Sequence, residues 1–193
     1  MCRLILASQS PRRRALLGQM GFEQFEVIPA QEEEERDPNL SPQALVEQLA
    51  RQKAEEVARR VNDPQAVVIG ADTIVVLHGK VLGKPENQAQ AFQMLSQLSG
   101  CRHMVYTGVA VIQGERQMVD HEATEVRFCA LTEQEILDYI DTGEPMDKAG
   151  AYGIQGRGAL LVDSIAGDFY NVVGLPICHL GRMLAGFGIR SMG

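Results

Sequence analysis

Several features that would place this 193-residue chain in a special class are missing from its sequence. No apolar run approaches the roughly 20 residues that span a membrane. The four cysteines (Cys2, Cys101, Cys129 and Cys178) are scattered without a CxxC pair, which favours reduced thiols over a disulfide framework or a zinc site. The basic cluster at 12–14 follows the first apolar run, so the N-terminus is not a signal peptide. These absences predict a cytoplasmic protein with no membrane partner.

Signatures of several catalytic and binding classes are missing too. The sequence has no HExxH motif and no Ser/His/Asp order, which makes a zinc or serine hydrolase a poor fit. Aromatic residues make up only 5% and the net charge is −7, and both values argue against a stable nucleic-acid complex. Hydrophobic residues at 45% and charged residues at 22% are ordinary for a globular protein of one domain or of two small lobes around a cleft.

The first unusual stretch is a helix start that carries three arginines. Residues 3–7 predict a strand, after which Ser10 suits an N-cap and Pro11 the first helical position. Arg12–Arg14 then occupy the first turn, where cations oppose the helix dipole. An anion held by free N–H groups, serine hydroxyls and guanidinium groups would remove this conflict. We therefore favour an anion site here over three solvated arginines.

Two further charged features follow. The acidic run Glu32–Glu35 comes after a short predicted strand, 25–28, and most such runs are solvated loops, although one glutamate could hold magnesium. A long helix is predicted from Ser41 to about Val61, and Lys53 falls on its apolar stripe. A lysine in that position either extends to water or reaches into a cleft, and both interpretations stay open.

The sequence is organised around residues 66–85. Two short β-branched runs, Ala66–Ile69 and Ile74–Leu77, predict two buried strands with Asp72 at the bend between them. Burying a carboxylate there costs free energy unless a nearby group pairs with it, so Asp72 either caps the bend or takes part in chemistry. Lys84 closes the stretch in the extended conformation that precedes proline.

The second half of the chain predicts further helices and strands around a glycine-rich stretch. The helices are expected over 86–98, from Thr132 to about Thr142 and over 177–187, and the strands over 103–112, 118–131, 159–165 and 169–173. The stretch 147–158 has four glycines in nine residues, which permits a close approach of a ligand. It matches neither a Walker P-loop nor the dinucleotide GxGxxG, and a flexible hairpin is the plain alternative.

Four distant segments thus break a local rule with a residue type that suits phosphates. They are the arginine helix start, Lys53 on its stripe, Asp72 with Lys84, and the glycine stretch with Lys148 and Gln155. Lysine and arginine groups clamp triphosphates, and acids hold magnesium and activate water.

Eight motifs in order then make the chain resemble the Maf family of nucleotide pyrophosphatases. They are LASQSPRRRALL, the EE after the second strand, RQKA, GADTIV, GKP, LSG, GEPMDKAGAYGIQG and VVGLP. The resemblance implies an α/β fold in which helices flank a curved mixed β-sheet, similar to inosine-triphosphate pyrophosphatases. It implies a single Maf-like domain over residues 1–193 with two lobes and a central cleft. The activity implied is cleavage of a nucleoside triphosphate to the monophosphate and pyrophosphate with a divalent cation, Mg²⁺ or Mn²⁺.

The resemblance also assigns roles to individual residues. It makes Asp72 the proton acceptor that activates water and a ligand of the metal, together with Glu33 or Glu34. The positions that match the lining of the phosphate cleft are Ser8, Arg13, Lys53 and Lys84.

Three positions indicate the substrate branch. The branch that acts on methylated guanine nucleotides usually has the tryptophan of PWR at position 12, the glutamine of DQ at position 73 and a glutamate at position 155. This chain has Arg12, Thr73 and Gln155 there, and in these residues it resembles the dTTP/UTP branch. A glutamine amide can accept from the N3–H of uracil or thymine and donate to a carbonyl, whereas a glutamate carboxylate only accepts and suits guanine donors. A homodimer is usual for the family. The resemblance suggests pool cleaning or cell-division control, and the alternative is a non-catalytic nucleotide-binding regulator of septum formation.

Overall fold

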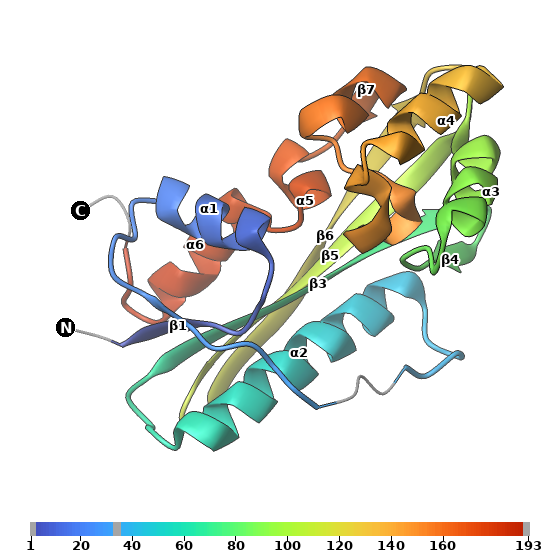
Figure 1. Ribbon diagram of the computed structural model, residues 1–193. Helices are drawn as coiled ribbons and strands as arrows, with labels where there is room; N and C mark the ends of the chain where they lie inside the picture. Colours follow the sequence, from blue (N-terminus) through green and yellow to red (C-terminus); the bar gives the residue numbers. More distant parts are fainter. Residues whose placement is uncertain (1–2, 33–35, 191–193) are drawn as a thin grey trace. The chain divides into compact units, whose positions relative to one another are not determined.

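The computed structural model describes residues 3–32 and 36–190, which form a mixed β-sheet flanked by helices (Figure 1). The strands are β1 (Leu4–Leu6), β2 (Glu26–Val27), β3 (Val67–Leu77), β4 (Lys80–Leu82), β5 (Arg102–Gln113), β6 (Arg116–Phe128) and β7 (Val162–Ala166). The α-helices are α1 (Pro11–Gln19), α2 (Pro42–Val61), α3 (Gln88–Leu98), α4 (Glu133–Asp141), α5 (Phe169–Val173) and α6 (Ile177–Gly186). Three 3₁₀ segments, η1 (Glu144–Asp147), η2 (Ala149–Ala151) and η3 (Gly156–Leu161), follow α4.

The sheet combines parallel and antiparallel pairs. Its strand order is β2-β1-β3-β5-β6-β7, and β4 pairs with β3 off this path. Strand β1 lies parallel to both β2 and β3, whereas the pairs β3–β4 and β6–β7 are antiparallel. The predicted fold class, α/β with a mixed sheet flanked by helices, is therefore confirmed.

The chain divides into two compact units. The first comprises Met1–Asp72, Thr107–Glu122 and Gly174–Gly193, and the second comprises Thr73–Tyr106 and Ala123–Val173. Each unit has its own buried cluster, which includes Ile5, Val57 and Val68 in the first unit and Leu95, Phe128 and Tyr152 in the second. A single domain with two lobes and a central cleft stays a prediction.

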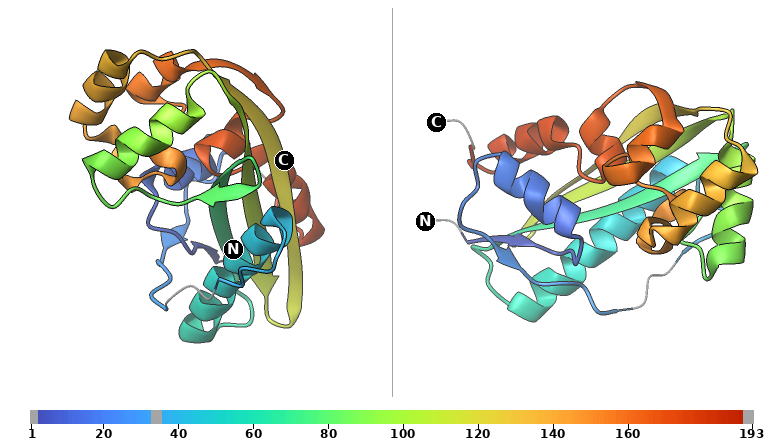
Figure 2. Two further views of the ribbon diagram at one scale, coloured as in Figure 1. Left: turned by 90° about the vertical axis from the view of Figure 1, so that its right-hand side faces the viewer. Right: turned by 45° about the horizontal axis from the view of Figure 1, so that its top comes forward.

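Within the first unit, helices cover both faces of the strands. Helices α1 and α6 lie together on one side, and α2 lies on the other (Figures 1 and 2). The side chain of Ser10 accepts a hydrogen bond from the N–H of Arg13, which confirms the predicted N-cap. The side chain of Ser41, where the second helix was predicted to begin, accepts one from the N–H of Ala44. In the described part of the chain, no helix is long and apolar enough to cross a membrane.

The prediction of two strands with a bend at Asp72 is wrong. Residues 67–77 form one continuous strand, and Asp72 lies inside it with 7% of its surface exposed. Gly70 marks close packing here instead of a turn, because a Cβ at this position would lie 2.2 Å from the carbonyl oxygen of Ala50 on α2. The glycine lets α2 pack directly against β3 and brings Lys53 over the strand.

Two predictions in the last third are also wrong. Residues 169–173 form helix α5 instead of a strand, since the side chain of Asp168 accepts the N–H of Tyr170 and Asn171 is buried with its amide donating to Val105 and Thr124. The strand predicted over 159–165 begins only at Val162. The helix predicted from Thr132, in contrast, is confirmed, and a capping box of Thr132 with Glu135 begins it.

Candidate active site

The first unit brings Ser8 and Arg13 together where β1 ends and α1 begins. The guanidinium Nη1 of Arg13 donates to Ser8 Oγ at 3.3 Å, and its Nε donates to the carbonyl oxygen of Gly174 at 2.7 Å. Ser8 Oγ also accepts the N–H of Ser10 at 3.2 Å. These contacts fix a cation and a hydroxyl beside the first turn of α1, which has no acidic residue to complement its dipole. Arg12 lies half-buried in the same turn.

Lys53 on α2 and Asp72 on β3 form a nearly buried ion pair. Lys53 Nζ donates to Asp72 Oδ1 at 2.5 Å, and the side chains are only 17% and 10% exposed. The lysine on the apolar stripe thus reaches a partner inside the unit. The ammonium group offsets much of the cost of burying the carboxylate, which would otherwise be high.

The second oxygen of Asp72 is the most informative atom of the site. Within residues 3–32 and 36–190, Asp72 Oδ2 is buried and has no hydrogen-bond partner. Buried carboxylate oxygens are rarely left without a partner, so this atom needs a ligand such as a water molecule or a cation. Asp72 is thereby anchored through one oxygen and available through the other.

The segments that carry the two pairs come from neighbouring strands. In the parallel β1–β3 pair, Leu6 lies opposite Ile69, and the N–H of Ala7 donates to Ile69. Ser8 follows two residues after the end of β1, and Asp72 lies three residues after Ile69 on β3.

Glu33 and Glu34, the predicted metal ligands, lie outside the described residues. The segment that leads to them is held by α2. Glu56, which is 5% exposed, accepts the N–H of Gln31 at 2.9 Å and a hydrogen bond from Arg60 at 2.7 Å. Arg60 also donates to the carbonyl oxygen of Pro29. The sequence analysis did not identify Glu56 as this anchor.

The predicted residues of the second unit lie on three different segments. Thr73 is half-buried on β3, and because it follows Asp72 directly, its side chain leaves the opposite face of that strand. Lys84 is exposed after β4, and Gln155 is exposed just before η3. The segments of Lys84 and the glycine stretch meet, since the N–H of Gly150 donates to the carbonyl oxygen of Gly83 at 3.0 Å.

The glycine stretch forms short 3₁₀ segments whose backbone is held by side chains, so the alternative of a flexible hairpin is wrong. The carboxylate of Glu144 accepts the N–H groups of Arg157 and Gly158 at 3.1 and 3.3 Å. Gly156 has φ +64° and a Cβ there would lie 2.9 Å from the same carboxylate. Glu144 thus binds the backbone that follows Gln155. The sequence analysis did not assign this role to Glu144, although it lies in the motif GEPMDKAGAYGIQG.

Tyr139 and Lys148 close the other side of this loop. The hydroxyl of Tyr139 accepts the N–H of Gly153 at 3.2 Å, and burial, with Glu144 nearby, raises the pKa of Tyr139 to about 12. The stem of Lys148 lies where a Cβ of Gly153 would be, and its ammonium group donates to the carbonyl oxygen of Glu144 at 2.6 Å. Lys148 is therefore engaged in holding the loop.

Comparison with known proteins agrees with this geometry. A family model described as "Maf-like protein" matches residues 3–187. A "dTTP/UTP pyrophosphatase" of Symbiobacterium thermophilum is 53% identical over 188 residues, covering 97% of this chain and 95% of the relative. A "dTTP/UTP pyrophosphatase" of Bacillus pumilus is 53% identical over 189 residues, covering 98% of each.

A solved structure supports the fold. The chain matches a HAM1 protein from Coxiella burnetii with a TM-score of 0.56 at 16% identity, over 96% of this chain and 100% of that one. At this identity the likeness concerns the fold alone.

Proposed function

The chain belongs to the Maf family, and from that premise we propose that it hydrolyses dTTP and UTP to the monophosphate and pyrophosphate. Relatives with this printed activity are 53% identical over nearly the full length. The structural observation that carries the proposal is the Lys53–Asp72 pair with its second carboxylate oxygen buried and available. That arrangement is suited to removing a proton in a site shielded from water.

Asp72 acts as the general base. Its Oδ2 accepts a proton from a water molecule while the water oxygen bonds to phosphorus and the anhydride bond between the α-phosphate and the pyrophosphate breaks. Lys53 holds Oδ1, so the carboxylate keeps one orientation through the reaction. Pyrophosphate leaves with the electron pair of the broken bond.

Ser8, Arg13, Lys53 and Lys84 bind the phosphates in this proposal. Their guanidinium, ammonium and hydroxyl groups donate to phosphate oxygens, and positive charge offsets the negative charge that develops on the leaving group. In the first unit, Arg13 is already oriented by Ser8 and by the Gly174 carbonyl group. Less of its side-chain freedom is lost when substrate binds.

Arg12, Thr73 and Gln155 distinguish the base. Gln155 sits at the start of η3 on a loop whose backbone is held by Glu144 and Tyr139, which limits where its amide can point. The amide donates to a pyrimidine carbonyl and accepts from N3–H.

A divalent cation, Mg²⁺ or Mn²⁺, fits the donor set. The residues expected to hold it are Asp72 and either Glu33 or Glu34, and Glu56 accepts the N–H of Gln31, two residues before Glu33. When bound, the cation neutralises polyphosphate charge and polarises phosphoryl oxygens. The family also leads us to expect a homodimer in the cytoplasm.

A panel assay tests the proposed function. Pyrophosphate release is measured from dTTP, UTP, CTP and a methylated GTP, with wild-type protein and with Asp72→Asn. We expect dTTP and UTP to be preferred and turnover to depend on Asp72. A regulator that only binds nucleotides would bind without releasing pyrophosphate, and that result would overturn the proposal.

A further inference from the structure

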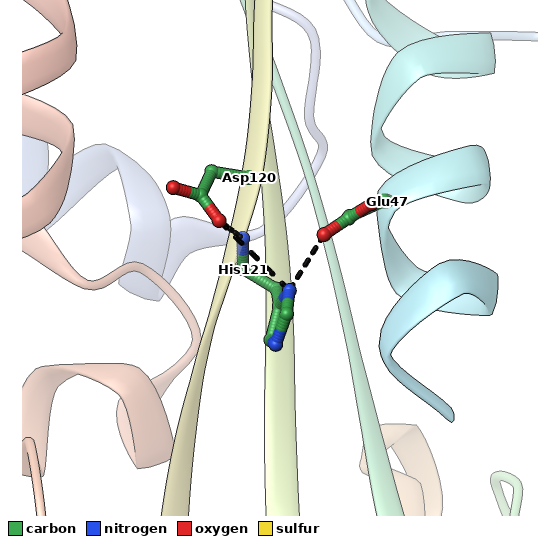
Figure 3. Close-up of side chains that lie close together, drawn as sticks. All are labelled: Glu47, Asp120 and His121. Atoms are coloured by element: carbon green, nitrogen blue, oxygen red, sulfur yellow. Dashed lines mark hydrogen bonds and ion pairs between the residues drawn. The ribbon is translucent and has the colours of Figure 1, made fainter. Parts of the chain in front are cut away.

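A second group of charged and imidazole side chains lies in the first unit, apart from the residues assigned to the reaction. Glu47 comes from α2, and Asp120 and His121 come from β6 (Figure 3). His121 Nδ1 lies 2.6 Å from Glu47 Oε1 and 3.9 Å from Asp120 Oδ1. One donor atom from each of the three residues lies within 4.8 Å of the other two.

This part of β6 is not paired with β7. Strand β7 pairs with β6 over Glu125–Phe128 in the described register, so Asp120 and His121 lie beyond the covered part of β6. Side chains of adjacent strand residues leave opposite faces, yet Asp120 Oδ1 lies only 3.9 Å from His121 Nδ1. The three side chains are each between 29% and 53% exposed, which leaves an ion free access.

The aspartate has two further neighbours. Asp120 Oδ1 accepts the N–H of His121 at 2.8 Å. His179 on α6 lies with Nε2 3.1 Å from Asp120 Oδ2, the oxygen that does not face His121.

We propose that Glu47, Asp120 and His121 form a binding site for a first-row transition-metal ion of the zinc type. In a tetrahedral zinc site with bonds near 2.0–2.1 Å, donor atoms lie about 3.4 Å apart, so shifts of about an ångström convert the observed spacings of 2.6 and 3.9 Å into that geometry. The imidazole nitrogen selects zinc over magnesium or calcium, which prefer oxygen ligands.

Metal binding requires that His121 Nδ1 carry no proton. If Nδ1 carries the hydrogen shared with Glu47, that proton leaves to solvent or the ring changes tautomer, and the Nδ1 lone pair then bonds to the metal. The metal would replace the hydrogen bond between His121 and Glu47 with coordinate bonds to residues of both β6 and α2. The ion would link β6 to α2, the helix that carries Lys53 six residues after Glu47.

Zinc titration of the metal-free full-length chain tests the site. Isothermal titration calorimetry compares wild type with Glu47→Gln, His121→Gln and the control Glu55→Gln, which changes an exposed carboxylate on the same helix. Asp72→Asn is included because zinc could instead bind at the proposed catalytic centre. NMR of the histidine rings in wild type identifies the ligand directly, even if a variant fails to fold.

We expect the site at His121 to bind one zinc ion equally well in wild type, Glu55→Gln and Asp72→Asn, and His121→Gln to lose about 100-fold or more in affinity at this site. Glu47→Gln should lose about tenfold or more, and millimolar Mg²⁺ should not displace the zinc. Zinc should shift the ring signals of His121 and leave those of His78 unchanged. Unchanged affinity in His121→Gln, loss of binding in Asp72→Asn, or unshifted His121 signals would each overturn the proposal.

Discussion

The two units hold their assigned residues by different means. In the first unit the contacts join charged or polar side chains, as in Lys53 with Asp72 and Arg13 with Ser8. In the second, Gln155 stands on a loop whose backbone N–H groups are bound by Glu144 and Tyr139. The contrast suggests that the first unit sets the rate for every triphosphate, and that the second decides which base is accepted.

The largest effect is expected from Asp72→Asn, which keeps the shape of the side chain but removes its basicity. Turnover of dTTP and UTP should fall by about 10²–10⁴, the usual contribution of a positioned base. Nucleotide binding, measured by calorimetry, should change much less. Unchanged pyrophosphate release would remove Asp72 from the reaction.

A comparable effect, on stability instead of rate, concerns His103 in the second unit. It is buried against Tyr152, and burial lowers its pKa from 6.5 to about 4. Between these pH values the His103 ring is therefore protonated in the unfolded chain and neutral in the folded chain. Stability is complete above pH 6.5 and falls as the pH drops toward 4, by about 3 kcal/mol in total.

Urea unfolding of wild type and His103→Gln between pH 7.5 and 4.5 measures this loss. The difference between the two pH profiles isolates the contribution of His103 from that of other titrating groups. Parallel profiles would show that the pKa of His103 is the same in the folded and the unfolded chain.

Lys53→Ala and Arg13→Ala should each lower kcat/KM for all triphosphates by roughly ten- to a hundredfold, the value of a hydrogen bond to a charged group. The preference for dTTP over CTP should stay. Lys53→Met keeps an unbranched apolar stem on the stripe of α2 but leaves the buried carboxylate of Asp72 without its ammonium partner, so it should unfold at a lower temperature than wild type. An altered base preference without a general loss would contradict the phosphate role.

Gln155→Glu addresses the second unit directly. The carboxylate loses the donor to the base carbonyl and sets a charge against it, at a cost of about 1–3 kcal/mol. We expect kcat/KM for UTP and dTTP to fall roughly ten- to a hundredfold, with a smaller loss or a gain for a methylated GTP. Equal losses for both substrates would move base recognition to another residue.

The smallest effect is expected from Glu144→Gln. The glutamine amide has one oxygen that can accept from the N–H of Arg157 or of Gly158, and its NH₂ group then faces the N–H of the other residue. The loop should loosen, and KM for UTP should rise about three- to tenfold with little change in kcat. A matched Glu133→Gln variant, on the exposed first turn of α4, should behave like wild type. Equal behaviour of both variants would show that Glu144 does not position Gln155.

Local chemistry made several elements predictable. Ser10, Ser41 and Thr132 each accept the N–H three residues later, as their positions before an apolar periodic segment indicated. Such caps depend on neighbours in sequence, so no tertiary information was needed. Lys53 was also identified as anomalous, because it breaks the stripe of its own helix.

Errors arose where distant residues decide the local structure. A bend was predicted at Asp72, but residues 67–77 are one strand, and the missing Cβ of Gly70 allows the contact with Ala50 on α2. Residues 169–173 looked like a strand by composition, yet the buried amide of Asn171 takes partners from β5 and β6. Propensity is a weak guide when packing or a buried hydrogen bond competes with it.

The sequence by itself determined the family, through eight motifs in order, and with it the identities of Asp72, Lys53 and Arg13 as candidates. Only the tertiary structure decided that Lys53 occupies one oxygen of Asp72 and leaves the other available, because α2 and β3 must pack before the two can meet. The same holds for Glu47 and His121, which are 74 residues apart. Neither breaks a local rule, and their chemistry exists only once α2 lies against β6.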